Sequence, residues 1–405
     1  MGDRRACGQK ISGAPRNLNS GASARCCRMV DSGGMVAPAD RWSLMALAVS
    51  IVGVVHLWVS VQALHYGDFV MFHTTVRALL HGRPAYEPHA LADGLWWNMN
   101  PPQFHLLIIP LAPLSLPAAA QVFRVVNALA MIAAVLLTFS VAELKSRRAA
   151  WLIVAGLLSP AVAMELGAGQ VAGLLALAAV AAWRGLNSNR PIAVGLAIGC
   201  ICAFKPIFLP LVAWLLFTRQ WEAAGAAIAT GLALIAASVV VWGMAPQIEW
   251  LRALGQVTWF DSRFNASWSV LPQRALQGNR VLTYQRLAAA SLALGLLVGL
   301  WAARLRPADG LAKCLVGSIA FAPLGWIYYL PVAGPLLMRR AFDGAPWPWL
   351  AWALWLPLPL VPDVNVPFLL RITLTSAYAW GMLALALHRG SSDNSGNVRL
   401  SRASR

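Results

Sequence analysis

Long apolar runs alternate with short basic clusters along most of the chain. The first run, residues 42–64, contains no charged side chain, and a helix of that length crosses the hydrocarbon core of a bilayer. Similar runs recur as far as residue 388, so the pattern predicts an all-α, polytopic membrane protein with about twelve transmembrane helices. The predicted spans are approximately 42–64, 118–144, 149–165, 169–186, 190–204, 205–218, 222–243, 282–304, 311–327, 329–341, 346–361 and 366–388.

The composition supports this class and argues against two others. The chain is 59% hydrophobic and 12% charged, whereas soluble proteins carry about 25% charged residues. The net charge of +17 does not indicate a nucleic-acid partner, because the basic residues lie in short clusters between apolar runs and not on one face. We therefore expect membrane lipids, and no nucleic acid, among the partners.

The basic clusters also predict the orientation. If the clusters between spans are cytoplasmic, the positive-inside rule holds throughout, and both termini are cytoplasmic. We expect disordered basic tails at 1–41 and 389–405, and one transmembrane domain at 42–388.

One apolar segment, 102–117, is too short for a full crossing and contains Pro110 and Pro113. If it crossed the membrane, the basic cluster at 145–148 would lie outside. We therefore expect an interfacial helix along the outer surface, within a large extracytoplasmic first loop.

Asp68 follows the first apolar run at the mouth of this loop. A carboxylate at a membrane surface is hydrated, paired or used in chemistry. One interpretation is a general base, which accepts a proton from a reacting hydroxyl. The other is an N-cap for a helix predicted over 69–80, because aspartate is a good cap.

Polar and basic side chains collect on the predicted outer side. Lys205 stands between two apolar runs, where a lysine is costly unless it snorkels or pairs. Arginines in the predicted outer loops are contrary to the positive-inside rule. One explanation for them is an anionic ligand such as a lipid phosphate. The alternative is that long outer loops tolerate charge. The candidates for binding phosphate are Lys205, Arg274 and Arg263. Further polar candidates on this side are Glu165, Gln170, Asn265 and Tyr328.

The histidines and cysteines do not predict a metal site. No His-x-x-x-His pair and no zinc-type cysteine spacing occurs in the sequence. Five of the seven histidines lie in or beside the first loop, and we interpret them as surface-loop residues: His65, His73, His81, His89 and His105. We expect no metal and no cofactor.

Several short motifs together resemble glycosyltransferase family 87, which includes polyprenyl-phosphate-mannose-dependent mannosyltransferases. The resemblance covers roughly residues 42–388. It is carried by Gly67-Asp68-Phe69, Arg77-Ala78-Leu79, Gly82-Arg83-Pro84-Ala85-Tyr86, Pro101-Pro102, Arg124, Asn127, Ser159-Pro160, Gly169-Gln170-Val171, Ala203-Phe204-Lys205-Pro206, Arg219-Gln220-Trp221, Asn265-Ala266-Ser267 with Arg274, and the segment 323–329.

The chain departs from the family pattern at three positions. Ala172 stands where the family commonly has asparagine, Ala322 replaces a serine, and Tyr328 replaces a histidine. The first change affects a polar contact, and the last removes any step that a histidine assists.

The resemblance implies a GT-C fold in a bacterial plasma membrane. It also implies that the donor is a hexose linked to polyprenyl phosphate, and mannose is the first candidate for that hexose. It implies inverting transfer to an extracytoplasmic glycolipid or glycan, with Asp68 at the position of the catalytic aspartate. In such an enzyme, the residues expected to bind sugar or acceptor are Glu165, Gln170, Asn265 and Tyr328. Two other interpretations stay open: an isoprenoid-lipid transporter or flippase, which would place ionisable residues near mid-membrane, and a non-catalytic subunit of cell-envelope glycan assembly.

Overall fold

The structure is a computed structural model that describes residues 67–91, 94–142, 160–260, 262, 264–275, 284–337, 367–373 and 376–387. The predicted spans 42–64 and 346–361 and both predicted tails lie outside the described residues, as does Arg263.

The described chain is helical, with one two-stranded antiparallel hairpin that pairs His89 with Trp96 and Leu91 with Gly94. The elements are α2 (Phe69–Leu80), β1 (His89–Leu91), β2 (Gly94–Trp96), α3 (Pro102–His105), η1 (Ile109–Leu111), α4 (Leu116–Ala142), α6 (Pro160–Ala168), α7 (Ala172–Asn187), α8 (Pro191–Phe204), η2 (Pro206–Phe208), α9 (Pro210–Phe217), α10 (Trp221–Trp242), α11 (Ala245–Leu254), α12 (Val270–Ala275), α13 (Tyr284–Ala302), α14 (Pro307–Ala320), η3 (Ile327–Val332), α17 (Phe368–Ile372) and α18 (Ala377–Leu387).

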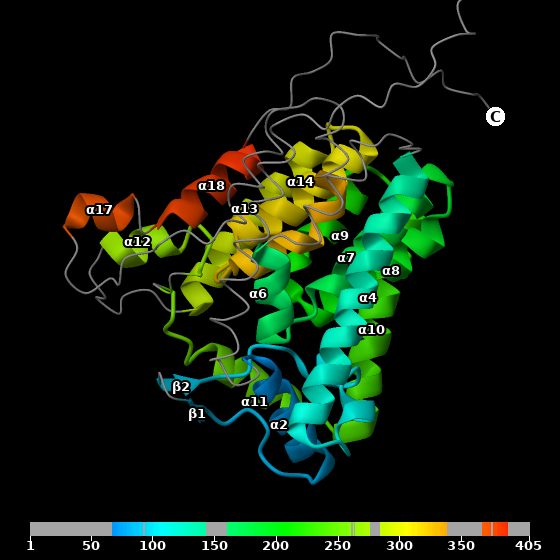
Figure 1. Ribbon diagram of the computed structural model, residues 1–405. Coiled ribbons are helices and arrows are strands. Elements are labelled where there is room, and N and C mark those ends of the chain that lie inside the picture. The colour runs from blue at the N-terminus through cyan, green and yellow to red at the C-terminus, as the bar shows by residue number, and fades with distance from the viewer. Residues whose placement is uncertain are drawn as a thin grey trace, which may run out of the picture. The chain divides into compact units, whose positions relative to one another are not determined.

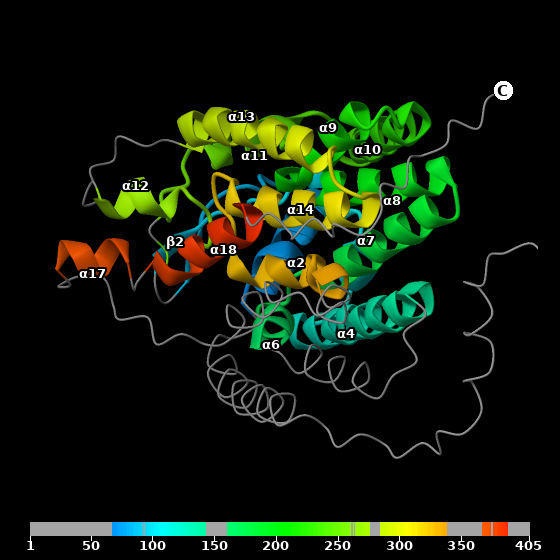
Figure 2. The same cartoon turned by 90° about the horizontal axis from the view of Figure 1, so that it is seen from above.

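The helices pack in two connected series. In the first, α4 contacts α7, α7 contacts α8, and α8 contacts α10; in the second, α9 contacts α13, α13 contacts α14, and α14 contacts α18. Figure 2 shows α7 and α8 between α4 on one side and α10 on the other. Helix α2, the hairpin and α11 lie together near one end of α4 and α10 (Figure 1).

The contact between α8 and α10 depends on two glycines spaced four apart. A Cβ atom on Gly199 would lie 2.6 Å from Thr230 Cβ and 2.7 Å from the carbonyl oxygen of Ala227, and one on Gly195 would clash with Ala223 and Ala226. Small residues at this spacing allow two helix backbones to approach closely, which is a common way for helices to pack within membranes.

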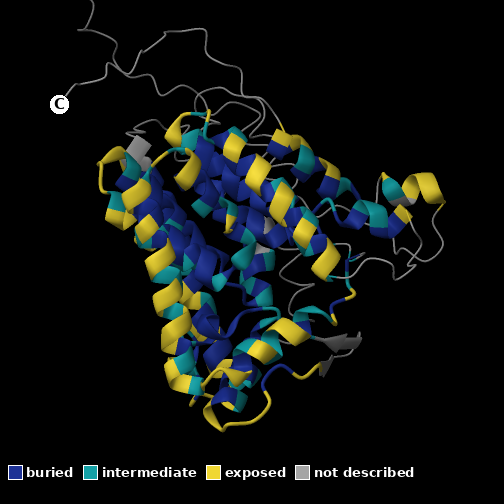
Figure 3. Ribbon diagram, turned by 180° about the vertical axis from the view of Figure 1, so that it is seen from behind, coloured by how far each residue is buried: buried dark blue, intermediate teal, exposed yellow. Residues whose placement is uncertain are grey.

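Three of the described helices are long and apolar enough to cross a membrane: Leu116–Thr138, Trp221–Trp242 and Tyr284–Ala302. They coincide with the predicted spans 118–144, 222–243 and 282–304. Their outward faces stay apolar, as at Leu129, Leu232 and Leu297, each about 60% exposed. Exposed residues run along the outer faces of the long helices in Figure 3. Apolar surface on this scale fits contact with lipid, and the fold is consistent with an all-α membrane protein.

The predicted spans 169–186 and 190–204 largely form the single helices α7 and α8, but other predicted spans are interrupted. The segment 205–218 divides into η2 and the eight-residue α9, and 366–388 divides into α17 and α18. Segment 102–117 forms α3, turns, η1 and the start of α4, and not one continuous helix. The count of twelve spans therefore remains a prediction.

The glycines provide a test of the α8–α10 contact. Gly199→Ala should lower the free energy of unfolding by about 1–3 kcal/mol, because the new methyl group overpacks against the Ala227 carbonyl. Gly231→Ala is the matched control, since a Cβ there meets nothing within 4 Å and alanine favours the helix by up to about 1 kcal/mol. Thermal unfolding of both variants in detergent checks the difference; equal melting temperatures would contradict it.

Candidate functional site

Four segments far apart in the sequence meet beside the N-terminus of α2. They contribute Asp68, the turn residue Gln170 between α6 and α7, Lys205 after α8, and the pair Tyr328 and Tyr329 in η3. All five side chains belong to one hydrogen-bonded group, so the fold brings together four of the residues that the sequence singled out and adds Tyr329.

Two glycine turns bring Asp68 and Gln170 together. Gly67 and Gly169 have φ angles of +50° and +68°, in the left-handed region that glycine adopts without strain. A Cβ atom on Gly67 would lie 2.7 Å from Ala168 Cα, and one on Gly169 would lie 2.6 Å from Phe69 Cβ. Each turn thus fits against the other helix only because it lacks a side chain.

The turn that carries Gln170 is also held by α4. Arg124 Nε donates to the carbonyl of Leu166 at 3.1 Å, and Asn127 Nδ2 donates to the carbonyl of Gln170 at 2.6 Å. Both α4 side chains therefore fix the backbone next to the site.

Asp68 occupies the N-cap position of α2, but its carboxylate makes no capping hydrogen bond. Oδ2 instead accepts hydrogen bonds from Gln170 Nε2 and from the Tyr328 hydroxyl at 3.1 Å. Burial raises the pKa of Asp68, and the two hydrogen bonds and the charge of Lys205 act against this increase. The capping interpretation is therefore wrong for the side chain, and Oδ1 has no partner among the described residues.

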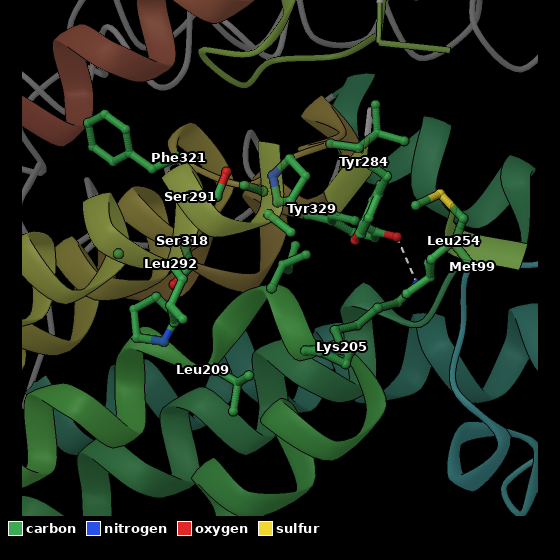
Figure 4. Close-up of a pocket in the computed structure, with 18 of the residues that line it drawn as sticks. Met99, Lys205, Leu209, Leu254, Tyr284, Ser291, Leu292, Ser318, Phe321 and Tyr329 are labelled. Carbon is green, nitrogen blue, oxygen red and sulfur yellow. Dashed lines mark hydrogen bonds between the residues drawn. The ribbon is translucent and has the colours of Figure 1, made fainter. Parts of the chain in front are cut away.

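Lys205 does not snorkel to the surface. Its side chain is 5% exposed, and Nζ donates to Asn100 Oδ1 at 2.6 Å, Tyr329 Oη at 2.7 Å and Gln170 Oε1 at 3.1 Å. Figure 4 shows the Lys205 side chain extending toward Tyr329. Burial lowers the pKa of Lys205 to about 7, and the nearby carboxylates of Asp68 and Glu165 oppose this shift.

A buried polar network in the first loop supports Lys205. Asn98 Oδ1 accepts from the backbone and side-chain nitrogens of Asn100 at 3.0 and 3.1 Å. Asn98 Nδ2 donates to Thr75 Oγ1 and to His105 Nε2, each at 2.8 Å. The Tyr86 hydroxyl donates to the carbonyl of Asn100 at 2.9 Å. The sequence analysis assigned no role to Asn98 or Asn100.

The interpretation of the first-loop histidines as surface residues is wrong for two of them. His105 is fully buried and His73 is 2% exposed. Burial lowers the pKa of His105 to about 3, so the ring is neutral. Since Nε2 accepts from Asn98, Nδ1 carries the hydrogen and faces the carbonyl of Pro101 at 3.3 Å.

A short extended segment holds the two tyrosines in place. Asn265 pairs with Trp326 as an isolated β-bridge, and its Oδ1 accepts from the amides of Ser267 and Gly325 at 3.0 and 3.1 Å. Its Nδ2 donates to the carbonyl of Phe260 at 2.8 Å. These contacts tie the Asn265 loop to the chain that leads into Tyr328.

Three of the predicted site residues that the structure describes lie outside the group: Glu165, Arg274 and Asn265. Glu165 is fully buried on α6, where Oε1 accepts from the amide of Gly173 near the start of α7 at 3.3 Å. Arg274 is buried on α12, where it donates to Ser376 Oγ at 3.0 Å and to the carbonyl of Ser262 at 3.3 Å. Neither residue, nor Asn265, lines the two cavities described next.

Two adjoining cavities meet at this group. The smaller, about 50 Å³, is the aspartate cavity, lined by Asp68, Met71, Phe72, Trp97, Asn98, Met99, Asn100, Gln170, Lys205, Trp259, Trp326, Tyr328 and Tyr329. The larger, about 290 Å³, is the apolar cavity, bounded mainly by η2, α9, α13 and α14. Met99, Asn100, Lys205, Trp326 and Tyr329 line both cavities and form a shared wall.

The chemistry available at this wall is acid–base and electrostatic. A carboxylate with a free oxygen faces one cavity, and an ammonium reaches the other. Within the described part of the chain, no group of three His, Cys, Asp or Glu side chains is arranged to hold a metal ion.

Comparison with known protein families assigns the chain to a reaction class. The profile of glycosyltransferase family 87 matches residues 98–325, a range that begins at Asn98 and includes Gln170 and Lys205. No curated protein and no solved structure matches the chain. The matched range covers more than half of the 405 residues, and three described helices are suited to crossing a bilayer. The protein is thus a membrane glycosyltransferase, and the chain belongs to glycosyltransferase family 87.

Proposed function

We propose that the protein transfers a hexose, mannose in the first instance, from a polyprenyl-phosphate sugar to an extracytoplasmic glycolipid or glycan, with inversion at the anomeric carbon. The observation that carries this proposal is the placement of Asp68 and Lys205 around one wall between two cavities. Asp68 is the general base, and Lys205 stabilises the leaving phosphate.

The step needs one base and one cation. The acceptor hydroxyl attacks the anomeric carbon, its proton passes to Asp68 Oδ1, and the bond from the anomeric carbon to the phosphate oxygen breaks. The electron pair of that bond stays on the phosphate. Lys205 compensates the growing negative charge by exchanging one of its three neutral partners for a phosphate oxygen, because a charge-assisted hydrogen bond is stronger.

The apolar cavity suits the isoprenoid chain of the donor. It is lined by Leu209 and Leu292, which are 48% and 56% exposed, so it reaches the outer surface of the molecule beside the candidate span α13. A lipid in the bilayer thus has a lateral path to Lys205, one of the residues that line this cavity in Figure 4.

The aspartate cavity suits the acceptor. Trp97, Trp259 and Trp326 line it next to Asp68, and aromatic faces are suited to stacking against sugar rings. In this proposal the acceptor hydroxyl approaches Asp68 from the aspartate cavity while the donor phosphate lies against Lys205.

The direction of the helices supports an extracytoplasmic site. Helix α7 runs from the Gln170 turn toward Arg184, and α8 returns from Arg190 to Lys205. Arg219 lies after α9, which again leads away from Lys205. The basic turns thus lie at the other ends of the helices from the site, as the positive-inside rule expects for a site outside the cytoplasm.

The first test is removal of the base. Asp68→Asn should reduce the rate of transfer by about 10²–10⁴-fold, because the amide cannot accept the hydroxyl proton. Purified protein in proteoliposomes, radiolabelled polyprenyl-phosphate mannose and membrane glycolipids provide the assay. Glu87→Gln, at an exposed carboxylate of the same loop, is the matched control and should keep full activity. A fully active Asp68→Asn protein would exclude Asp68 as the base.

The second test is the dependence of kcat/KM on pH. Activity needs Asp68 ionised and Lys205 protonated. It should rise as pH passes the raised pKa of Asp68, and fall as pH passes the pKa of Lys205, lowered to about 7. Lys205→Arg should remove the alkaline decrease and keep the acidic one, because arginine stays charged throughout this range. An unchanged alkaline limb in Lys205→Arg would show that another group causes it.

A further inference from the structure

The side chain of Gln170 lies between the two charged residues of the site. Its Nε2 donates to Asp68 Oδ2, and its Oε1 accepts from Lys205 Nζ at 3.1 Å and from the Tyr329 hydroxyl at 3.5 Å. The side chain is 3% exposed, so water does not compete for these contacts. Asp68 and Lys205 therefore interact through an amide and not by direct contact.

The orientation of this amide follows from its neighbours. An ionised carboxylate only accepts hydrogen bonds, and an ammonium only donates them. The NH₂ group must face Asp68, and the oxygen must face Lys205. The backbone of Gln170 is fixed as well, because its amide donates to the carbonyl of Glu165 at 3.0 Å and its carbonyl accepts from Asn127 Nδ2 at 2.6 Å.

A direct ion pair between Asp68 and Lys205 would make Asp68 a poorer base and Lys205 a poorer partner for phosphate. A cation in contact with Asp68 would stabilise its ionised form and make it a poorer base. The carboxylate would also neutralise Lys205 before any phosphate arrived, so the ammonium would have less charge to offer the leaving group.

We propose that Gln170 is a positioning residue, a neutral spacer that prevents a direct ion pair between Asp68 and Lys205 and so keeps a base at one cavity and a cation at the other. The catalytic part of this inference, in which Asp68 is a base and Lys205 a cation for the phosphate, rests on the proposed function. It differs from the prediction that Gln170 binds sugar or acceptor, because both functional ends of the amide are already used within the protein.

The other titratable groups near the pair come from three elements. Tyr328 and Tyr329 face Asp68 from η3, Glu165 lies on α6 and affects Lys205, and neutral His105 lies on α3. None of these side chains is hydrogen-bonded to both Asp68 and Lys205, as Gln170 is, so the effect of removing the spacer is separable from theirs.

The experiment follows the protonation of Asp68 by infrared difference spectroscopy of the full-length protein in lipid. The carboxyl band is assigned by its loss in Asp68→Asn, and the readout does not require turnover. In Gln170→Ala the missing spacer should allow Lys205 to reach Asp68, which lowers the midpoint of the Asp68 titration by about one pH unit or more. In Lys205→Met, where no ion pair can form, the same alanine substitution should raise the midpoint, because only a hydrogen-bond donor is lost.

The opposite signs in the two backgrounds distinguish a spacer from a simple donor. If Gln170→Ala raises the midpoint in the presence of Lys205, or leaves it unchanged, the spacer role is overturned.

A second variant tests the proposal even if Gln170→Ala does not fold. Gln170→Glu keeps the size of the side chain, and its carboxylate should pair with Lys205 and raise the midpoint of Asp68 by like-charge repulsion. It should also weaken binding of polyprenyl phosphate several-fold. Gln256→Glu adds the same charge at an exposed position outside the site and should change neither measurement. Unchanged values in Gln170→Glu would contradict the proposal.

The transfer assay run in parallel separates the two proposals. If the midpoints move as expected while the unmodified protein transfers no sugar, the proposed function fails and the spacer stands. If transfer occurs and the midpoints do not move as expected, the spacer fails and the proposed function stands.

Discussion

The fold around the site depends on keeping one ammonium buried. Removing a charged group from water costs several kcal/mol unless good hydrogen bonds replace its hydration. Lys205 meets this requirement with three partners, and each comes from a different part of the chain: Asn100 in the first loop, Gln170 in the α6–α7 turn and Tyr329 in η3. A single buried charge therefore links segments that are separated by more than 200 residues.

The partners are themselves held in place. Asn100 is oriented by Asn98, which in turn is fixed by Thr75 and by the neutral ring of His105. On the other side, the Asn265 loop is joined by backbone hydrogen bonds to the segment that carries the tyrosines. These contacts leave the acceptor atoms little freedom and so fix the position of the ammonium, which the proposed electrostatic role of Lys205 requires.

Hydrophobic patterning predicted the long helices well, because α4, α10 and α13 each expose an apolar face that needs no partner within the protein. The charge pattern also grouped Asp68, Gln170, Lys205 and Tyr328 on one side, and the structure brings these side chains together. The same reasoning grouped Glu165 and Arg274 with them. A predicted topology, however, gives only the side of the membrane on which a residue lies, and not its distance from other residues on that side. The roles of Asn98 and His105 could not be predicted, since their partners depend on how the first loop folds over α2 and α3.

The wall between the two cavities consists of side chains and not of a helix. Met99, Asn100, Lys205, Trp326 and Tyr329 separate the space beside Asp68 from the space bounded by α9, α13 and α14. For a reaction between a lipid-bound and a glycan substrate, such a partition lets each molecule arrive and depart by its own route. In the proposed reaction, the spent lipid returns to the bilayer while the elongated glycan still occupies the other side, so neither product has to wait for the other to leave.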